Sequence, residues 1–421
     1  MGHRIVLTSF GSYGDVFPYV GLALELRARG HHPVLAMPGY ARDLVEREGL
    51  EFHAVRPDGD LNDIATIARI MDPARGTEYL IREIMMPALA DSEADIAPLL
   101  ADADLVVTHP LSFAAVYLAE KAAIPWVSTV LAPISFLSRY DMPVAPGAPW
   151  TKGLEAIPGV ASLFTRLGKA MTRRWVRPVE DRRRALGLPT TLNPLAEGQH
   201  SPAAVIALFS SVLAEPKPDW PENVTVTGAV QYNGVDAEQP LSAALIDFLA
   251  AGPAPVVFTL GSAAVAAAGT FFEESLAAVQ ILGVRAVLLV GAHAENQPIG
   301  TIPDTVRLEP YAPHAALFPH AAAIVHQGGI GTLHQALRSG RPMLTVPFSH
   351  DQPDNAHRVA RLGCSRTLLP SRYRARRVAR ELGRLLDDPI CHDRAQAVAA
   401  QVRAEGGASA ACDVIESLLP R

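Results

Sequence analysis

The chain has 421 residues, of which 49% are hydrophobic and 19% are charged, and its formal net charge is −6. This composition excludes a disordered or fibrous protein, and the length predicts two domains of about 200 residues each. The negative charge argues against binding to nucleic acid or to an anionic membrane surface. The three cysteines, Cys364, Cys391 and Cys412, lack the spacing of a zinc site or a disulfide framework, as expected for a reducing compartment.

The first residues, "MGHRIVLTSF", predict a strand rather than a secretory leader, and the sequence has no apolar run of about 20 residues that could span a bilayer. We therefore expect a cytoplasmic protein without an integral membrane segment. Peripheral contact with a membrane is left open by these observations.

Apolar strands alternate with helices along the first 130 residues. Strands are predicted in "RIVLTSF", "PVLAMP", "DLVVTHP" and "PWVSTVL", and the first helix is predicted over 18–29, with Pro18 in its first turn. Strands that are apolar throughout are typical of a parallel sheet covered by helices on both faces. Residues 1–215 are therefore predicted to form a Rossmann-like, doubly wound domain, in which the irregular segment 132–200 shapes a site.

The same alternation returns after a break. Residues 216–240 are rich in Pro, Gly, Asp and Asn, which predicts an interdomain linker. Residues 241–400 contain further apolar strands with helical stretches between them, and residues 401–421 are expected to form a helix that packs back toward the first domain. The predicted fold class is α/β, with two Rossmann-like, doubly wound parallel-sheet domains that face each other across a cleft and bind ligands at the carboxyl ends of their strands.

The strongest local pattern is "AAIVHQGGIGTLHQALRSGRPMLTVPF", which predicts a strand, a glycine turn, a helix and a second strand in succession. The amides at the start of such a helix form a site for a diphosphate. The GGxG spacing disfavours a dinucleotide fingerprint, and no P-loop string is present. The residues expected at this anion site, including a neighbouring turn in "TLGSAAV", are Gly261, Ser262, His326, Gly328, Gly329, Gly331 and Thr332.

The first turn of the chain, "GSYGDVFP", carries an acid, Asp15, where a phosphate loop would need positive charge. One interpretation of Asp15 is a cap for the helix expected at Pro18, and another is a catalytic role. Two further pairs of acids, Asp58 with Asp60 and Asp102 with Asp104, are interpreted as solvated loop residues. No metal site is predicted.

Three segments resemble a known family: "GSYGDVFPYVGLALELRARGH", "DWPENVTVTG" and "YAPHAALFPHAAAIVHQGGIGTLHQALRSGRPMLTVPFSHDQPDNA". The family is that of the inverting nucleotide-sugar glycosyltransferases of the GT-B fold, family 1, which includes antibiotic, flavonoid and sterol glycosyltransferases. The resemblance covers nearly the whole chain. The stretches "HSPAAVIALFSSVLAEPKPDWP" and "HDQPDNAHRVARLGC" are most similar to a bacterial subgroup that contains the rhamnosyltransferase acting on hydroxy fatty acids in rhamnolipid synthesis.

The resemblance implies a donor site for a UDP- or dTDP-hexose, with UDP-glucose and dTDP-rhamnose as the candidates. Tyr311 would stack on the base and the backbone of Ala312 would bind it, while Asp351 and Gln352 would contact sugar hydroxyls. The residues of the predicted anion site would hold the diphosphate without a metal or another cofactor. The chain departs from plant members of the family at three positions, which here are His314, Ile330 and His334.

The resemblance also implies that a base from the first domain takes the proton of the acceptor hydroxyl. Asp15 occupies the position of this base, which is histidine in plant members and aspartate in several bacterial ones, and His109, at the end of another strand, is a candidate partner. The expected acceptor is a hydrophobic, hydroxylated small molecule or lipid. The residues expected to line its pocket are Met85, Met86, Phe113, Phe136, Tyr140 and Met142.

Two other functions are compatible with paired Rossmann-like domains. One is a nucleotide-sugar epimerase or an NAD-linked enzyme. The other is a non-catalytic helper that binds a sugar nucleotide and activates a partner.

Overall fold

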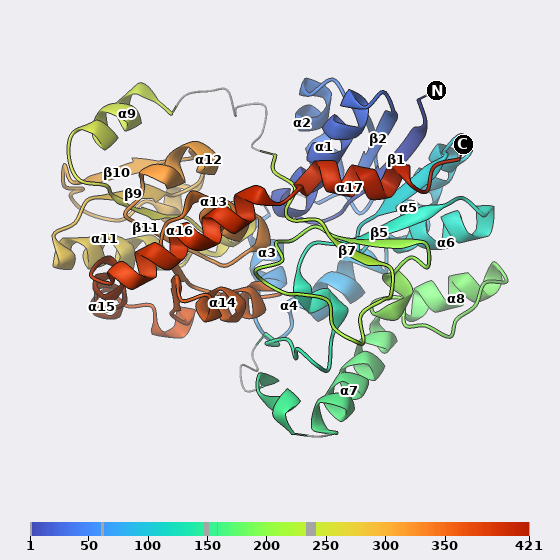
Figure 1. The fold of residues 1–421 in the computed structure, drawn as a ribbon. Helices are drawn as coiled ribbons and strands as arrows, with labels where there is room; N and C mark the ends of the chain where they lie inside the picture. Colours follow the sequence, from blue (N-terminus) through green and yellow to red (C-terminus); the bar gives the residue numbers. More distant parts are fainter. Residues whose placement is uncertain (1, 60–62, 147–150, 158, 233–240, 421) are drawn as a thin grey trace.

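The structure, a computed structural model, describes residues 2–59, 63–146, 151–157, 159–232 and 241–420. Two parallel β-sheets with helices on their faces make up this part of the chain (Figure 1). The first sheet has the strand order β3-β2-β1-β4-β5-β6-β7 and the second has the order β10-β9-β8-β11-β12-β13. This confirms the predicted α/β class with two doubly wound parallel sheets.

The strands of the first sheet are β1 (Arg4–Thr8), β2 (His32–Met37), β3 (Glu51–Ala54), β4 (Leu105–Thr108), β5 (Trp126–Val130), β6 (Ala204–Ala207) and β7 (Val224–Val226). Those of the second sheet are β8 (Val256–Phe258), β9 (Ala286–Leu289), β10 (Val306–Glu309), β11 (Ala323–His326), β12 (Met343–Thr345) and β13 (Ser365–Thr367).

The helices that precede β6 are α1 (Tyr13–Ala28), α2 (Arg42–Arg47), α3 (Ile64–Ile70), α4 (Gly76–Tyr79), α5 (Leu89–Ile96), α6 (Phe113–Ala122), α7 (Val160–Trp175) and α8 (Arg177–Ala185). Those that follow are α9 (Ala243–Ala250), α10 (Gly261–Ala264), α11 (Phe271–Leu282), α12 (His314–Leu317), α13 (Ile330–Ser339), α14 (Gln352–Arg361), α15 (Ala375–Leu386), α16 (Pro389–Ala404) and α17 (Gly407–Glu416).

Alternate residues of the central strand β1 pack on opposite faces of the first sheet. Ile5 and Leu7 join a buried cluster with residues of α1 and α17, whereas Val6 joins one with residues of α5 and α6. A strand buried on both sides has no polar face, which explains the apolar runs in the sequence.

Four strands were not expected from the sequence: β3, β6, β7 and β13. β3, β7 and β13 are only partly buried and contain polar residues, so their pattern of a buried strand is weak. β6 is apolar and buried throughout and was overlooked. β7 falls inside the range 216–240 that was predicted as a linker, and there it extends the first sheet. The segment 132–200, expected to be irregular, contains α7 and α8.

The two sheets are tied together by segments that reach across. α17 returns to pack on α1, where Arg29 forms ion pairs with Asp413 at 2.6 Å and Glu416 at 2.7 Å. Ile67 of α3, a helix of the first half, belongs to the buried cluster of the second sheet. Within the described residues no single helix is long and apolar enough to cross a membrane, although one pair bent by 96°, Gly261–Ala267 with Phe271–Leu282, matches a span in length and composition.

Candidate active site

Each sheet has one place where its strand order reverses. In the first sheet the chain winds outward in both directions from the neighbours β1 and β4, and in the second sheet it does so from β8 and β11. In open α/β sheets, the carboxyl ends of such strand pairs form the crevice that binds ligands. The loops at these four strand ends carry Asp15, His109 and the residues of the predicted anion site.

The loop after β1 closes on its own aspartate. Asp15 Oδ2 accepts hydrogen bonds from the Ser12 amide at 2.8 Å and from the Ser12 hydroxyl at 3.3 Å. Ser12 is the N-cap of α1 and forms a capping box with Asp15. At Gly11 φ is +132°, and a Cβ there would stand 2.2 Å from Asp15 Oδ2, so glycine is required for this turn.

The expected start of this helix at Pro18 is wrong. α1 begins at Tyr13, and Pro18 lies inside it. The capping box starts the helix more than one turn before the proline. Asp15 therefore does support a helix start, as the third residue of α1 rather than as the N-cap, and one of its oxygens remains outside the capping box.

His109 lies next to that second oxygen. Its Nε2 is 3.5 Å from Asp15 Oδ1, and its Nδ1 accepts the N–H of Leu111 at 3.1 Å. Because a ring nitrogen that accepts a hydrogen bond carries no proton, the proton of the neutral ring is on Nε2, toward the carboxylate. The side chain of Asp15 is 33% exposed, against 5% for His109. The ring of His109 thus lies beside a carboxylate that Ser12 holds in place, and the carboxylate is the more exposed of the two groups.

The turn of Asp15 faces the second sheet at close range. A Cβ at Gly331 would stand 3.6 Å from the Cα of Gly14, so the first turns of α1 and α13 nearly touch. Ile330, the first residue of α13, packs against buried clusters of both sheets. Asp15 and the predicted anion site therefore lie near each other, where the first turns of α1 and α13 meet.

The turn after β11 presents open amides. Gly329 is the N-cap of α13, and no side chain caps this helix. At Gly328 φ is +86°, and a Cβ at Gly261, where φ is +65°, would stand 2.3 Å from Gln327 Nε2. Uncapped amides and the positive end of the helix dipole together favour an anion.

His326 adds a donor to this turn. Its Nδ1 accepts the N–H of Gly328 at 3.1 Å, and its Nε2 is buried without a hydrogen-bond partner among the described residues. Burial lowers the pKa of His326 to about 3, so the ring is neutral with its proton on Nε2. Thr332 belongs to the same place, since its Oγ1 lies 3.2 Å from where a Cβ of Gly261 would be, and Ser262 follows Gly261 in the chain. The structure thus brings together the predicted anion-site residues.

Asp351 and Gln352 lie where β12 leads into α14. Burial is the main cause that raises the pKa of Asp351 to about 7, and the charge of Asp15 raises it further. Near neutral pH, Asp351 can therefore donate as well as accept a hydrogen bond. Gln352 Oε1 accepts the N–H groups of Phe348 at 2.8 Å and Ser349 at 3.3 Å, which leaves its amide nitrogen for a ligand.

Asn355 was overlooked in the sequence. Its Nδ2 donates to Gly328 O at 3.0 Å and to Asp351 Oδ2 at 2.6 Å, and its Oδ1 is buried without a partner among the described residues. Asn355 thereby ties the glycine turn to Asp351. It stands in the motif "HDQPDNA", four residues after Asp351 and on the same helix face, a spacing that could have identified it.

The histidines that replace other residues of plant relatives have structural contacts. His334 Nε2 accepts the N–H of Ser210 at 3.2 Å, and burial lowers its pKa to about 4. The ring of His314 stacks on Phe318 at 4.5 Å. His334 therefore contacts the backbone of Ser210, and its Nε2 is already used as the acceptor of that hydrogen bond.

The two residues predicted for base binding follow β10. Tyr311 is 57% exposed and Ala312 is 3% exposed. A flat ring at the surface beside a buried backbone is the arrangement expected of a stacking platform.

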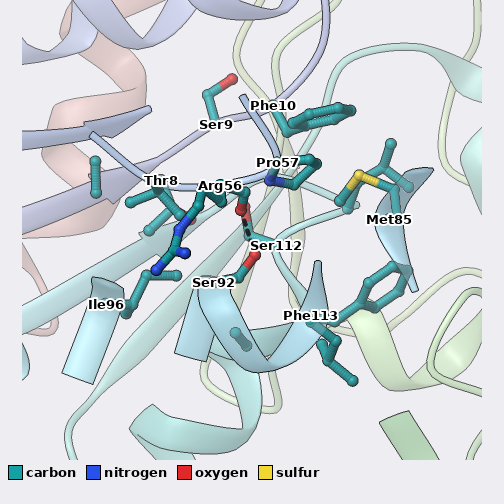
Figure 2. A pocket seen from close by; sticks show the side chains of 15 residues that line it. Thr8, Ser9, Phe10, Arg56, Pro57, Met85, Ser92, Ile96, Ser112 and Phe113 are labelled. Atoms are coloured by element: carbon teal, nitrogen blue, oxygen red, sulfur yellow. Dashed lines mark hydrogen bonds between the residues drawn. The ribbon is translucent and has the colours of Figure 1, made fainter. Parts of the chain in front are cut away.

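The six residues predicted for the acceptor pocket do not share one cavity. Met85 and Phe113 line a space of about 20 Å³ between α6 and the loops after β1 and β3, which has room for a single water (Figure 2). Phe113 also lines a second cavity together with Phe136. Met86 and Met142 are buried, and Tyr140 is half exposed with the Arg139 guanidinium 4.9 Å from its ring centre.

The second cavity has a volume of about 610 Å³, and its lining includes Pro110, which follows His109 in the chain. Phe113, Val116 and Glu120 of α6 form one wall, and their spacing places them on one helix face. In another wall, Phe136 stacks between Trp220 at 3.9 Å and His200 at 5.4 Å. Pockets for small organic ligands typically measure about 300–1,000 Å³.

The described residues contain no group of three or more His, Cys, Asp or Glu side chains that could hold a metal ion. Of the acids considered for metal binding, Asp58 accepts the N–H of Gly39 at 2.8 Å and Asp104 accepts that of Arg4 at 2.8 Å. Asp60 lies outside the described residues.

Two family models match the chain: the glycosyltransferase family 28 N-terminal domain over residues 5–137 and the erythromycin biosynthesis protein CIII-like C-terminal domain over residues 274–418. O-mycaminosyltylonolide 6-deoxyallosyltransferase of Streptomyces fradiae is 32% identical over 430 residues, in an alignment that covers 98% of this chain and 97% of that one. The chain belongs to the family 1 glycosyltransferases. This decides against the epimerase and NAD-linked alternatives.

Solved structures place this glycosyltransferase in the GT-B fold. The glycosyltransferase of kitacinnamycin superposes with a TM-score of 0.72 at 23% identity, covering 100% of this chain and 99% of that one. Spinosyn rhamnosyltransferase SpnG, complexed with thymidine diphosphate, gives a TM-score of 0.69 at 19% identity, covering 98% of this chain and 100% of that one. The predicted family and fold are both confirmed.

Proposed function

We propose that this glycosyltransferase moves a hexose from a nucleoside diphosphate to a hydroxyl of a hydrophobic acceptor, with inversion, without a metal, and with Asp15 as the general base. The observation that carries the proposal is the closeness of Asp15, which has His109 Nε2 3.5 Å from its Oδ1, to the uncapped glycine turn at the start of α13. The first turn of α1 offers a proton acceptor and that of α13 offers donors for an anion.

Asp15 has a carboxylate oxygen, Oδ1, that can accept a proton from a substrate. Its Oδ2 accepts hydrogen bonds from Ser12, whereas its Oδ1 lies 3.5 Å from His109 Nε2. The charge of Asp15 also acts on the neighbouring His350 and Asp351. A hydroxyl hydrogen-bonded to Oδ1 would pass its proton there as its oxygen bonds to the sugar. A positioned base of this kind typically accelerates a reaction by about 10²–10⁴-fold.

The leaving diphosphate would be stabilised by protein donors alone. The amides of residues 329–332, the dipole of α13 and the N–H of His326 would all stabilise the negative charge that develops on the leaving diphosphate. Since the acceptor would attack from the side of Asp15 while the diphosphate departs toward α13, the new bond would form opposite the broken one. Inversion at the sugar carbon follows.

The donor we favour is a dTDP-linked 6-deoxyhexose, the class that includes dTDP-rhamnose, with UDP-glucose as the alternative. A relative that is 32% identical is named as a 6-deoxyallosyltransferase, and a structural neighbour is a rhamnosyltransferase complexed with thymidine diphosphate. Asp351 and Gln352 would contact the sugar and Tyr311 the base. The acceptor would occupy the cavity of about 610 Å³ that begins at Pro110, next to His109.

The test is a panel of dTDP- and UDP-sugars in a thermal-shift assay, because a ligand that binds the native state raises its melting temperature. Donors that bind are then incubated with hydroxylated apolar acceptors, with and without EDTA, and the anomeric configuration of the product is read by NMR. The proposal expects transfer that EDTA does not affect and an inverted anomer. Binding without hydrolysis or transfer would instead favour the non-catalytic helper.

A further inference from the structure

The outer face of α7 is unusually apolar for a surface helix. Leu163, Leu167 and Met171 follow each other at intervals of four residues and are 56%, 61% and 55% exposed. Ile157, just before the helix, is 51% exposed. Residues four apart share one helix face, so these side chains form a continuous stripe about 12 Å long from Leu163 to Met171. α7 stands at the outside of the molecule, away from both sheets (Figure 1).

The same helix is strongly basic. Its 16 residues include four cations, Arg166, Lys169, Arg173 and Arg174, and no acid. Lys169 and Arg173 form ion pairs with Glu197 and Glu180. Arg166 and Arg174 have no ion-pair partner among the residues that the structure describes, and both are exposed. Positive charge that the protein does not neutralise thus borders the apolar stripe.

The helix is held firmly from its inner side. Asn193 Nδ2 donates to Lys169 O at 2.9 Å, and Trp175 and Val176 at the carboxyl end pack against the buried cluster around α6. The stripe therefore stays on the outside as a preformed surface and is not a segment that packs into the core.

We propose that α7 docks the protein on an anionic lipid bilayer, with Leu163, Leu167 and Met171 at the level of the acyl chains and Arg166 and Arg174 at the lipid phosphates. An exposed apolar stripe bordered by unneutralised arginines matches the two layers of such a surface. The net charge of −6 argues against such a surface for the chain as a whole, but interactions beyond about 8–10 Å are screened at physiological salt, so the basic residues of α7 count for more at a bilayer that this helix touches.

A second copy of this chain fits the face less well. A symmetric dimer brings the same patch of both copies together, so Arg166 and Arg174 of one chain would lie against those of the other. Like charges at such close range oppose association. A bilayer that carries negative charge has no such conflict.

The test is sedimentation of the full chain with vesicles of phosphatidylcholine alone and of phosphatidylcholine with phosphatidylglycerol. We expect binding to the anionic vesicles only, weakened by added salt. The variant Leu167→Glu/Met171→Glu should lose at least about tenfold in vesicle affinity, and so should Arg166→Ala/Arg174→Ala. The matched control, Ile281→Glu/Ile299→Glu, adds the same charge at exposed positions of 57% and 89% on the other half of the chain and should bind like the wild type.

Thermal unfolding of each variant shows whether it is folded. The proposal is overturned if the wild type binds neither kind of vesicle or if Leu167→Glu/Met171→Glu binds as well as the control. It is also overturned if light scattering finds a wild-type dimer that Leu167→Glu/Met171→Glu abolishes, because the face would then belong to a second copy.

Discussion

His109 and His326 hold equivalent places in the two sheets. Each stands at the carboxyl end of the strand next to the reversal of strand order, and each accepts, at Nδ1 and 3.1 Å, the N–H of the residue two positions further on. Each ring therefore presents a proton on Nε2. The proton of His109 faces the carboxylate of Asp15, and we propose that the proton of His326 faces the diphosphate.

This equivalence predicts that the two histidines affect different steps. His326→Ala should weaken dTDP or UDP binding by about tenfold to a hundredfold, since a hydrogen bond to a charged group contributes about 1.5–3 kcal/mol. His109→Ala should leave this affinity unchanged and lower kcat, because its contact is with Asp15. Isothermal titration calorimetry and steady-state kinetics measure the two effects. Equal losses of nucleotide affinity in both variants would contradict the assignment.

Asp15→Asn should reduce kcat by at least about a hundredfold, because the amide cannot take a proton. The amide oxygen can still accept the N–H of Ser12, so the capping box and the melting temperature should be kept. Nucleotide affinity should stay close to that of the wild type. Turnover at the wild-type level would show that the base is another group.

The carboxyl of Asp351 should make stability depend on pH. Its pKa of about 7 in the folded protein lies above the ordinary 3.8, so folding binds a proton. The stability that this carboxyl contributes is complete below pH 3.8 and is lost as the pH rises through 7. Asp351→Asn keeps a neutral group and should therefore melt higher, relative to the wild type, above pH 7 than at acid pH.

The difference in melting temperature between Asp351→Asn and the wild type cancels the titration of the groups that the two proteins share. The control is Asp304→Asn, which removes a carboxylate from an exposed position. A pH-independent difference in melting temperature for Asp351→Asn would mean that its carboxyl is not protonated in the folded state.

Arg358 joins the two halves through a buried ion-pair network. It is 3% exposed and binds Asp354 at 2.6 Å, Asp141 of the segment after β5, and Leu213 O at 3.2 Å. Burial alone would raise the pKa of Asp141, but the charges of Arg358 and Lys152 lower it to about 2. Arg358→Met leaves two buried carboxylates without this partner and should lower the free energy of unfolding by about 3–5 kcal/mol.

Arg361→Met provides the comparison for this prediction. Its side chain is 60% exposed and lies 3.9 Å from Asp141, so its loss should change the free energy of unfolding by about 0–1 kcal/mol. Urea denaturation measures both variants. If the two differ by less than the error of the fits, the buried network does not stabilise the fold.

The sequence was sufficient for features that depend on neighbouring residues. The central strands β1, β4, β8 and β11 each contain a run of three buried apolar residues, and the turn of Gly328 to Gly331 carries its own helix start. The start of α1 is expected at Pro18 because proline is common in a first turn, but Ser12 and Asp15 act together across three residues. The contact of His334 with Ser210 joins residues 124 apart, and no local pattern predicts it.

The residues predicted for the acceptor pocket also depend on contacts that no local pattern shows. Phe113 and Phe136 line the large cavity, whereas Met142 is 1% exposed and contacts Thr165 across 3.5 Å. Apolar residues are common both in pockets and in cores, and only the packing around each one separates the two cases.

α17 completes the core of the first sheet although it follows the second sheet in the chain. Ala411, Cys412 and Ile415 belong to the same buried cluster as Ile5 and Leu7 of β1. A ribosome adds about 5–20 residues per second, and domains tend to fold in the order in which they emerge. Here the strands of the second sheet, up to β13, leave the ribosome before α17 can cover α1. The half of the protein that is made first is therefore the half that is finished last.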